Sequence, residues 1–239
     1  MTPRHVLVFE DAAWRGLYPI TLSRPAFDCR VGGAPLARRL LAQLARREWK
    51  HAGLLCRPIL RPLVERDYPH HDVNRELRGD TLFLNGRLLA LGGGLDALME
   101  LLEKSVAVQI HGELVAAALS GTAAESFRST LAEALEQGVA APMPPHQTVT
   151  GPPEGIRLAR HPWDLVSWNI ETIEDDFHWA RHQGQTGEPR LAVGAQVLQK
   201  DHILARDEVQ VEPGGILDAR SGPIILGEGV VVEHNAVVL

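Results

Sequence analysis

The order of apolar and polar residues divides the chain into two parts with different periodicities. Up to about residue 190, short apolar runs alternate with stretches of helical spacing. The run at residues 6–9 is apolar throughout and has strand length, which indicates a strand buried on both faces. Residues 35–49 place leucines at helical spacing behind a proline, which predicts an amphipathic helix. Further strands are expected at residues 54–56 and 81–84, and further helices at residues 95–103 and 125–137.

This alternation predicts an α/β domain with a Rossmann-like, mainly parallel sheet and right-handed crossovers. Prolines and glycines are concentrated at residues 142–155, which predicts a loop. One helix is then expected from His161 to about His182. We therefore place the α/β domain at residues 1–188.

Beyond this domain, aliphatic residues recur in steps of six. They fall in two registers, which are Val211 with Leu217, and Leu226 with Val232 and Val238. Acidic or small residues follow them, as expected if the aliphatic side chains point inward from flat faces and small residues fit tight corners. This is the hexapeptide repeat of a parallel β-helix, so the start of a left-handed β-helix is expected at residues 189–239. The alternative is an ordinary valine-rich antiparallel hairpin.

The repeat region is short for a stable β-helix. A coil takes about three hexapeptides, so residues 209–239 make fewer than two coils, whereas about three stacked units are normally needed to bury a core. The sequence stops at three apolar residues, 237–239. We therefore expect either a truncated or split form of a longer chain, or a partner chain that covers the open end.

Composition excludes several classes of protein. Of the 239 residues, 45% are hydrophobic and 23% are charged, which is the balance of an ordinary globular protein. The net charge of −6 argues against nucleic-acid binding, and the arginine-rich stretch at residues 38–47 is interpreted as a solvated helix face. No apolar run approaches the roughly 18 residues of a membrane span. Cys29 and Cys56 lack the spacing of a disulfide framework or a zinc site, so a cytoplasmic protein is expected.

The N-terminal segment carries the most specific motifs. Residues 17–21 read Leu-Tyr-Pro-Ile-Thr, Arg24 precedes Pro25, and residues 31–36 read Val-Gly-Gly-Ala-Pro-Leu. In order and spacing they resemble the opening of sugar-1-phosphate nucleotidyltransferases, and Pro-Trp-Asp-Leu at residues 162–165 resembles the end of their catalytic domain. With a hexapeptide tail, the layout is similar to that of the bifunctional N-acetylglucosamine-1-phosphate uridyltransferase/glucosamine-1-phosphate acetyltransferase family, in the divergent branch that opens with Phe-Glu-Asp.

The resemblance implies uridylyl transfer from UTP to N-acetylglucosamine 1-phosphate with Mg²⁺ and release of pyrophosphate. Such a reaction depends mainly on positioning and charge neutralisation. The resemblance also implies that Arg24, at the place of the family's lysine, and Arg15 act in catalysis. The nucleotide and the sugar phosphate would be bound by Gly32, Gly33, Arg30, Asn85 and Arg87. An acetyl-CoA site would lie beyond Leu239, and a homotrimer is expected when the β-helix is complete.

Two departures from the family pattern concern the phosphates and the metal. The glycine-rich loop, whose bare backbone N–H groups can approach a phosphate, is replaced by Glu-Asp-Ala-Ala at residues 10–13. The two carboxylates would repel a triphosphate unless Mg²⁺ bridges them. Arg87 replaces the family's metal-binding aspartate after an Asn-Gly pair. Since Mg²⁺ prefers carboxylate and phosphate oxygens, Asp11 or Asp164 would have to hold it, or catalysis is lost.

Other interpretations stay open at this level. The same chemistry could use dTTP and glucose 1-phosphate. A degenerate domain would only bind a nucleotide sugar, or support oligomerisation. Without the family context, Gly32 and Gly33 would form a plain turn before a helix, and Arg15 and Arg24 would make surface ion pairs.

Three further groups of polar residues are given no catalytic role. His70, His71 and Asp72 are interpreted as a solvated turn after a proline rather than as metal ligands. Residues 174–176 are interpreted as an exposed helix face. His234 lies in the repeat region, earlier than the coils that carry the acetyltransferase histidine in the related family.

Overall fold

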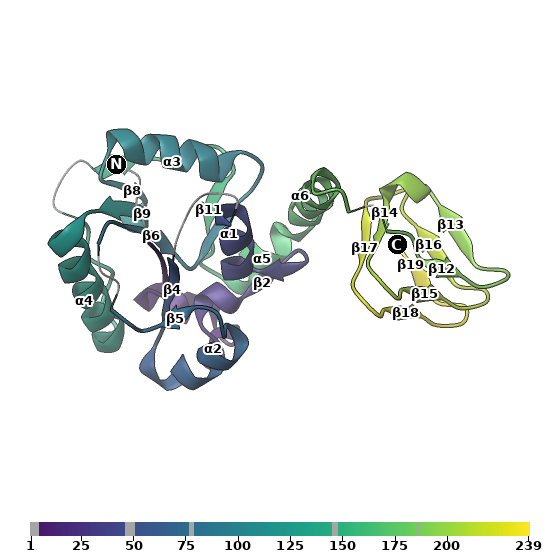
Figure 1. Cartoon of the computed structure of the whole chain (residues 1–239), viewed down its shortest axis with the longest axis horizontal. Helices are drawn as coiled ribbons and strands as arrows, with labels where there is room; N and C mark the ends of the chain where they lie inside the picture. Colours follow the sequence, from purple (N-terminus) through teal and green to yellow (C-terminus); the bar gives the residue numbers. More distant parts are fainter. Residues whose placement is uncertain (1–4, 46–50, 77–78, 145–147, 186) are drawn as a thin grey trace. The chain divides into compact units, whose positions relative to one another are not determined.

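The computed structural model describes residues 5–45, 51–76, 79–144, 148–185 and 187–239, and the chain forms two compact units (Figure 1). The first unit is Met1–Ser167 and the second is Trp168–Leu239. The boundary expected from the sequence, after residue 188, lies within the second unit, because the helix α6 (Asn169–His182) belongs to that unit.

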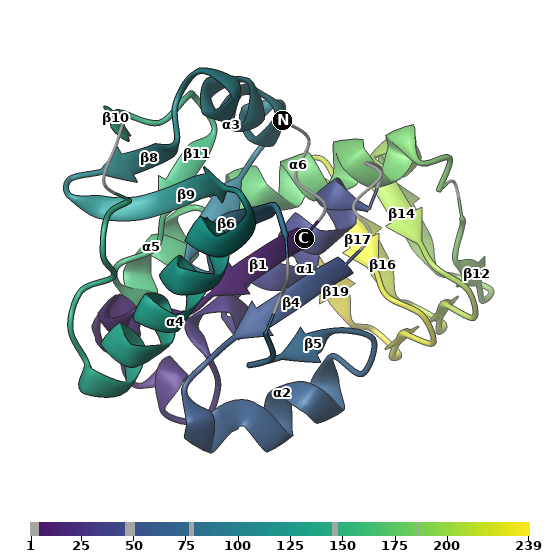
Figure 2. The same ribbon diagram turned by 60° about the vertical axis from the view of Figure 1, so that its left-hand side comes forward.

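A seven-stranded sheet forms the centre of the first unit, in the order β10-β8-β9-β6-β1-β4-β5. β1 (His5–Phe9) lies between β4 (His51–Leu55) and β6 (Thr81–Asn85) and is parallel to both (Figure 2). The remaining strands are β5 (Asp72–Val73), parallel to β4; β9 (Glu113–Leu119), antiparallel to β6; β8 (Ala107–Ile110), antiparallel to β9; and β10 (Thr148–Thr150), parallel to β8. The expected α/β fold with parallel central strands is confirmed. β5, β8 and β9 were not predicted, and β10 lies within residues 142–155, where a loop was expected.

Helices cover both faces of this sheet. α1 (Leu36–Leu44), α2 (Arg61–Asp67) and α3 (Gly94–Lys104) share one core cluster with Val6 and Val8 of β1. α4 (Gly121–Gln137) shares the opposite cluster with Leu7 and Phe9. Because β1 is buried on both faces, its sequence is apolar without alternation. The helices expected at residues 95–103 and 125–137 are confirmed.

Two short antiparallel strand pairs complete the strands of the first unit, and a helix break lies at its end. β2 (Arg30–Val31) pairs with β3 (Ala34–Pro35), and β7 (Leu88–Ala90) pairs with β11 (Ile156–Leu158). The single helix expected from His161 to His182 is wrong, because α5 (Pro162–Ser167) ends before α6 begins. No glycine or proline lies at Trp168, so the sequence carries no local signal for this break.

The second unit combines α6 with short parallel strands. These are β12 (Arg190–Leu191), β13 (Gln196–Leu198), β14 (Ile203–Ala205), β15 (Gln210–Val211), β16 (Ile216–Asp218), β17 (Ile224–Leu226), β18 (Val231–Val232) and β19 (Val237–Val238). Each pairs in parallel with the strand three further on, where the described chain provides one. The antiparallel hairpin is therefore wrong for residues 189–239.

The spacing of six places aliphatic side chains in one core. Val211 lies opposite Val232, and Leu217 opposite Val238, in neighbouring strands. Leu204 points to a separate small cluster with Phe177 and Ala180 of α6, so this helix packs on the β14–β17 pair. None of the helices among the described residues has both the length and the apolar character that crossing a membrane requires.

Candidate functional site

The carboxyl ends of the three central strands bring charged residues from distant parts of the chain to one edge of the sheet. Glu10 and Asp11 follow β1, Arg57 follows the end of β4 by two residues, and Arg87 follows the end of β6 by two. Parallel strands end at the same edge, and this edge is where open α/β sheets bind ligands. The N–H of Gly86 donates to the Phe9 carbonyl at 2.7 Å, which joins two of these strand ends.

Glu10 and Arg57 form a buried ion pair. Arg57 Nε donates to Glu10 Oε2 at 3.1 Å, and Ala26 N–H donates to Glu10 Oε1 at 2.8 Å. Glu10 is 1% exposed. Burial raises the pKa of the Glu10 carboxyl above its ordinary value, and the Arg57 guanidinium opposes this rise.

Arg57 also fixes the loop that carries the predicted catalytic arginines. Its Nη2 donates to the carbonyls of Thr21 at 2.7 Å and Arg24 at 3.0 Å. Its guanidinium lies over the Trp14 ring, 3.6 Å from the ring centroid. The Arg57 side chain therefore holds the segment from residue 14 to 26 against the sheet edge, with the Arg24 side chain exposed.

Asp11 and Arg87 form a second ion pair beside the first. Arg87 Nε donates to Asp11 Oδ1 at 2.8 Å and Nη2 donates to Asp11 Oδ2 at 2.7 Å, a bidentate arrangement. Arg87 Nη1 donates to the Ala159 carbonyl at 2.8 Å. Asn85 Nδ2 donates to Asp11 Oδ2 at 2.9 Å, and Asn85 Oδ1 accepts from the Arg87 N–H. Arg87 is 0% exposed, so its guanidinium does not face solvent.

A third carboxylate at this edge is also paired with arginine. Glu113 begins β9, which is antiparallel to β6 and so starts at the same edge. Its Oε2 lies 3.4 Å from Arg87 Nη2 and 3.2 Å from Arg160 Nε. Glu10, Asp11 and Glu113 thus each have a guanidinium partner.

The two carboxylates expected to hold Mg²⁺ are engaged in interactions with the protein. Both oxygens of Asp11 accept from the Arg87 guanidinium. Asp164 Oδ2 accepts the backbone N–H groups of Arg160 and His161, each at 2.8 Å, and so caps the start of α5. In the part of the chain that the structure describes, no three His, Cys, Asp or Glu side chains are grouped as metal ligands.

Arg15 and Arg24, the two predicted catalytic residues, are both exposed. Arg15 Nη1 donates to the Gly138 carbonyl at 3.2 Å, and its guanidinium lies 5.0 Å from the centroid of the Trp14 ring. Trp14 is therefore flanked by the cations of Arg15 and Arg57. Its indole Nε1 is buried and has no hydrogen-bond partner among the described residues.

Gly32 and Gly33 form the two-residue turn between β2 and β3, and Gly32 has a φ of 61°. Arg30 Nη1 donates to the Gly33 carbonyl at 3.0 Å, which closes the turn. α1 begins directly after β3. The glycines thus have a clear conformational role before this helix.

The two thiols are buried beside the Glu10–Arg57 pair. Cys29 and Cys56 are not joined in a disulfide, and burial raises the pKa of each to about 12. They remain protonated at neutral pH and are not suited to nucleophilic chemistry.

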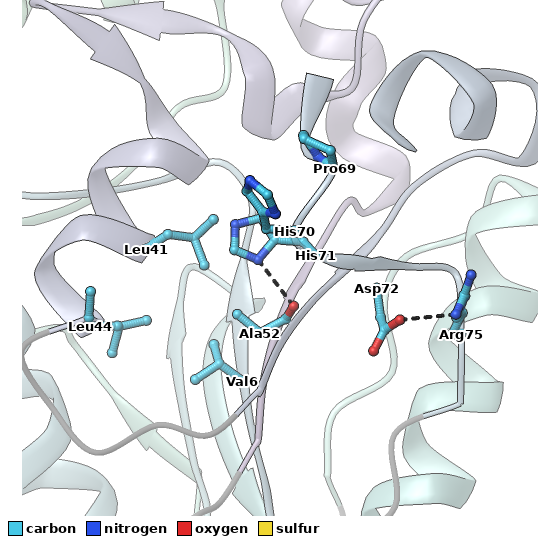
Figure 3. Close-up of a pocket in the computed structure, with 10 residues that line it drawn as sticks. Val6, Leu41, Leu44, Ala52, Pro69, His70, His71, Asp72 and Arg75 are labelled. Atoms are coloured by element: carbon cyan, nitrogen blue, oxygen red, sulfur yellow. Dashed lines mark hydrogen bonds and ion pairs between the residues drawn. The ribbon is translucent and has the colours of Figure 1, made fainter. Parts of the chain in front are cut away.

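A cavity of about 500 Å³ lies at the opposite, amino-terminal edge of the sheet (Figure 3). Leu41 and Leu44 face the imidazoles of His70 and His71 across it, and His71 Nδ1 lies 3.3 Å from the Ala52 carbonyl. Burial lowers the pKa of His71. Of the three residues expected in a solvated turn, His70 is exposed in a turn, whereas His71 is half-buried and Asp72 begins β5.

Sequence reasoning missed Arg57, Glu113 and Arg160. Arg57 follows a predicted parallel strand, so its place at the carboxyl edge was a usable signal. Glu113 reaches this edge because β9 pairs with β6, and Arg160 reaches it because the chain returns there after β11. Neither residue lies in a distinctive local sequence pattern.

Comparison with known proteins gives one family match. The model of a family described as sugar nucleotidyl transferase matches residues 6–184. The comparison with curated proteins gave no match. A solved structure, described as that of a mannose-1-phosphate geranyltransferase from Thermus thermophilus, is similar, with 13% identity and a TM-score of 0.42, over 97% of this chain and 91% of that chain.

Proposed function

The chain belongs to the sugar nucleotidyl transferase family, and we propose that it transfers a nucleotidyl group to a sugar 1-phosphate at the carboxyl edge of the sheet. A phosphate oxygen of the sugar 1-phosphate would form a bond to the α-phosphorus of the nucleoside triphosphate. The bond from that phosphorus to the bridging oxygen would break, and pyrophosphate would leave with both electrons of the bond. Such a transfer needs positioning and charge neutralisation more than covalent chemistry.

The pairing of Glu10 with Arg57 and of Asp11 with Arg87 is the observation that carries this proposal. Unpaired, the two carboxylates would repel a triphosphate. Each carboxylate is neutralised by a guanidinium within 3.1 Å. Arg15 and Arg24 are exposed, so a ligand at this edge would meet their positive charge. We assign Arg24 and Arg15 to phosphate neutralisation, and the turn at Gly32 and Gly33 to the nucleotide.

The proposed substrates are UTP and N-acetylglucosamine 1-phosphate, and the alternative pair is dTTP and glucose 1-phosphate. The test is pyrophosphate release by the purified protein, with each of four nucleoside triphosphates against several sugar 1-phosphates. The pair with the highest kcat/KM identifies the substrates. If another pair is used best, the assignment of UTP is wrong and the reaction class stands.

Arg24→Ala is expected to lower kcat/KM by about 100-fold, the usual loss when one preorganised donor to developing charge is removed. Arg206→Ala is the matched control, because Arg206 is also exposed but lies in the second unit. An Arg24→Ala protein as active as the control would contradict the role of Arg24.

A second candidate is a domain that binds a nucleotide sugar without turnover. The commitment of Asp11 to Arg87 favours it, since a catalytic metal would need that carboxylate. Binding of UDP-N-acetylglucosamine by calorimetry, together with no pyrophosphate release for any pair, would select it.

For the second unit, we propose the start of a left-handed parallel β-helix that assembles as a trimer. The pairing of each strand with the strand three further on supports this. Light scattering coupled to gel filtration tests the trimer, and a monomer at micromolar concentration would contradict it.

A further inference from the structure

Both oxygens of the Asp11 carboxylate already accept hydrogen bonds in this arrangement. Oδ1 accepts from Arg87 Nε at 2.8 Å, and Oδ2 accepts from both Arg87 Nη2 at 2.7 Å and Asn85 Nδ2 at 2.9 Å. Mg²⁺ demands oxygen ligands at roughly 2.0–2.1 Å in near-octahedral geometry. A cation at Asp11 would therefore either lie directly against the Arg87 guanidinium or displace it.

A displaced Arg87 side chain would still be buried in the protein. Its side chain is 0% exposed, and Nη1 is held by the Ala159 carbonyl at 2.8 Å. A guanidinium does not lose its proton in a protein, so its charge would stay buried next to the incoming cation. The remaining counter-charge is Glu113, at 3.4 Å, and Arg160 shares that carboxylate.

We propose that Arg87 is a built-in replacement for a divalent cation at Asp11, and that this edge of the sheet binds phosphate groups through arginines rather than through a metal ion held by the protein. The first half rests on the Asp11–Arg87 geometry alone. The second half rests on the proposed function, because it assumes that the ligand carries phosphate. A metal ion that a nucleotide brings with it belongs to the ligand and is outside the proposal.

The first half is tested with Mn²⁺ alone, which is paramagnetic and broadens nearby NMR signals. The chain has four asparagines, Asn74, Asn85, Asn169 and Asn235, so selective ¹⁵N-asparagine labelling gives a simple set of side-chain amide signals. The Asn85 amide donates to Asp11 and reports on a cation there. Asn235 is exposed in the second unit and reports on Mn²⁺ free in solution.

With substoichiometric Mn²⁺, we expect the Asn85 signal to keep its intensity at least as well as the Asn235 signal. Preferential broadening of Asn85 in the wild-type protein would overturn the proposal. Arg87→Asp removes the guanidinium and places a second carboxylate at the end of β6, so it is expected to create Mn²⁺ broadening at Asn85. A folded Arg87→Asp protein without such broadening would overturn the role given to Arg87. If this variant does not fold, the wild-type titration decides.

The second half is tested with inorganic pyrophosphate by calorimetry, in EDTA and in Mg²⁺. We expect the two dissociation constants to agree within about threefold, and Arg24→Ala to weaken binding by about tenfold or more. Pyrophosphate binding that requires Mg²⁺ would overturn this half. No binding in either buffer would contradict a phosphate site altogether, and with it the proposed function. The Mn²⁺ titration would still test whether Arg87 replaces a cation at Asp11.

Discussion

Arg87 links three parts of the first unit that lie far apart in the sequence. It connects Asp11 after β1, Glu113 at the start of β9 and the Ala159 carbonyl, all from a fully buried position. Removing one partner of a buried pair leaves the other charged and unsolvated. We therefore expect Arg87→Met to lower the free energy of unfolding by about 3–5 kcal/mol, measured by urea denaturation.

Arg61→Met is the control for this variant. Arg61 pairs with Glu65 on the exposed surface of α2, and such a pair contributes about 0.3–0.5 kcal/mol. If the Arg87 and Arg61 variants lost the same small amount of unfolding free energy, the Asp11–Arg87 pair would not stabilise the folded protein.

Glu10 gives the stability of the first unit a pH dependence. Burial raises its pKa above the ordinary value of 4.5, so the folded state holds the proton to higher pH than the unfolded chain does. The contribution of Glu10 to stability is then fully present below pH 4.5 and is lost as the pH rises through the folded-state pKa. We expect the free energy of unfolding of the wild-type protein to fall, relative to that of Glu10→Gln, as the pH is raised from 4.5 to neutrality. Urea denaturation across this range measures the difference, and a difference that is constant or of opposite slope would be contrary evidence.

Single-residue roles were the hardest to predict from the sequence. Arg15 and Arg24 are exposed in the loop between β1 and β2, and their catalytic role stays a prediction. The partner of Asp11 is 76 positions away and depends on the order of strands in the sheet. The family resemblance assigned Asp11 to the metal and Arg87 to the substrate, and it gave no reason to pair them.

At the scale of elements, the loop between β1 and β2 depends on one side chain from another strand end. Arg57 donates to two of its carbonyls, pairs with Glu10 and covers the Trp14 ring. Lysine offers no equivalent planar fork, so Arg57→Lys should not replace it. We expect Arg57→Lys to increase amide hydrogen exchange of residues 19–26 by about tenfold, which corresponds to about 1.4 kcal/mol of local stability.

Exchange in α4 provides the internal reference for this loop, since no contact of Arg57 with α4 is described. Equal increases in the loop and in α4 would indicate a global loss of stability instead. No increase in the loop would mean that Arg57 does not hold it.

Elements with one strong pattern were predictable, and those with weak patterns were not. β1 is apolar from Val6 to Phe9, and α4 has helical spacing over residues 125–137. β9 is centred on Ala116, Ala117 and Ala118, small residues without strong strand preference, and its place is set by pairing with β6. The break at Trp168 is marked by neither glycine nor proline.

At the scale of the whole molecule, the two periodicities of the sequence correspond to two separate cores. The clusters around β1 contain residues of the first unit, whereas the cluster around Leu217 contains residues of the second. The steps of six could be recognised because the strands of the second unit are short, and Val211, Leu217, Leu226 and Val232 are buried at this spacing. The spacing of six was recognised from Val211 in β15 onward, whereas the strands of the second unit begin with β12.

Separate cores predict separate losses of stability. Leu217 in β16 and Leu82 in β6 are both 0% exposed, so replacing either with alanine leaves a cavity that costs about 2–5 kcal/mol. We expect Leu217→Ala to lower hydrogen-exchange protection of residues 190–239 and leave β1 and β6 unchanged, and Leu82→Ala to do the reverse. Mass spectrometry of exchanged peptides at low urea concentration separates the two regions. If either substitution lowered protection equally throughout the chain, the two units would unfold as one, and stability would be a property of the pair rather than of each core.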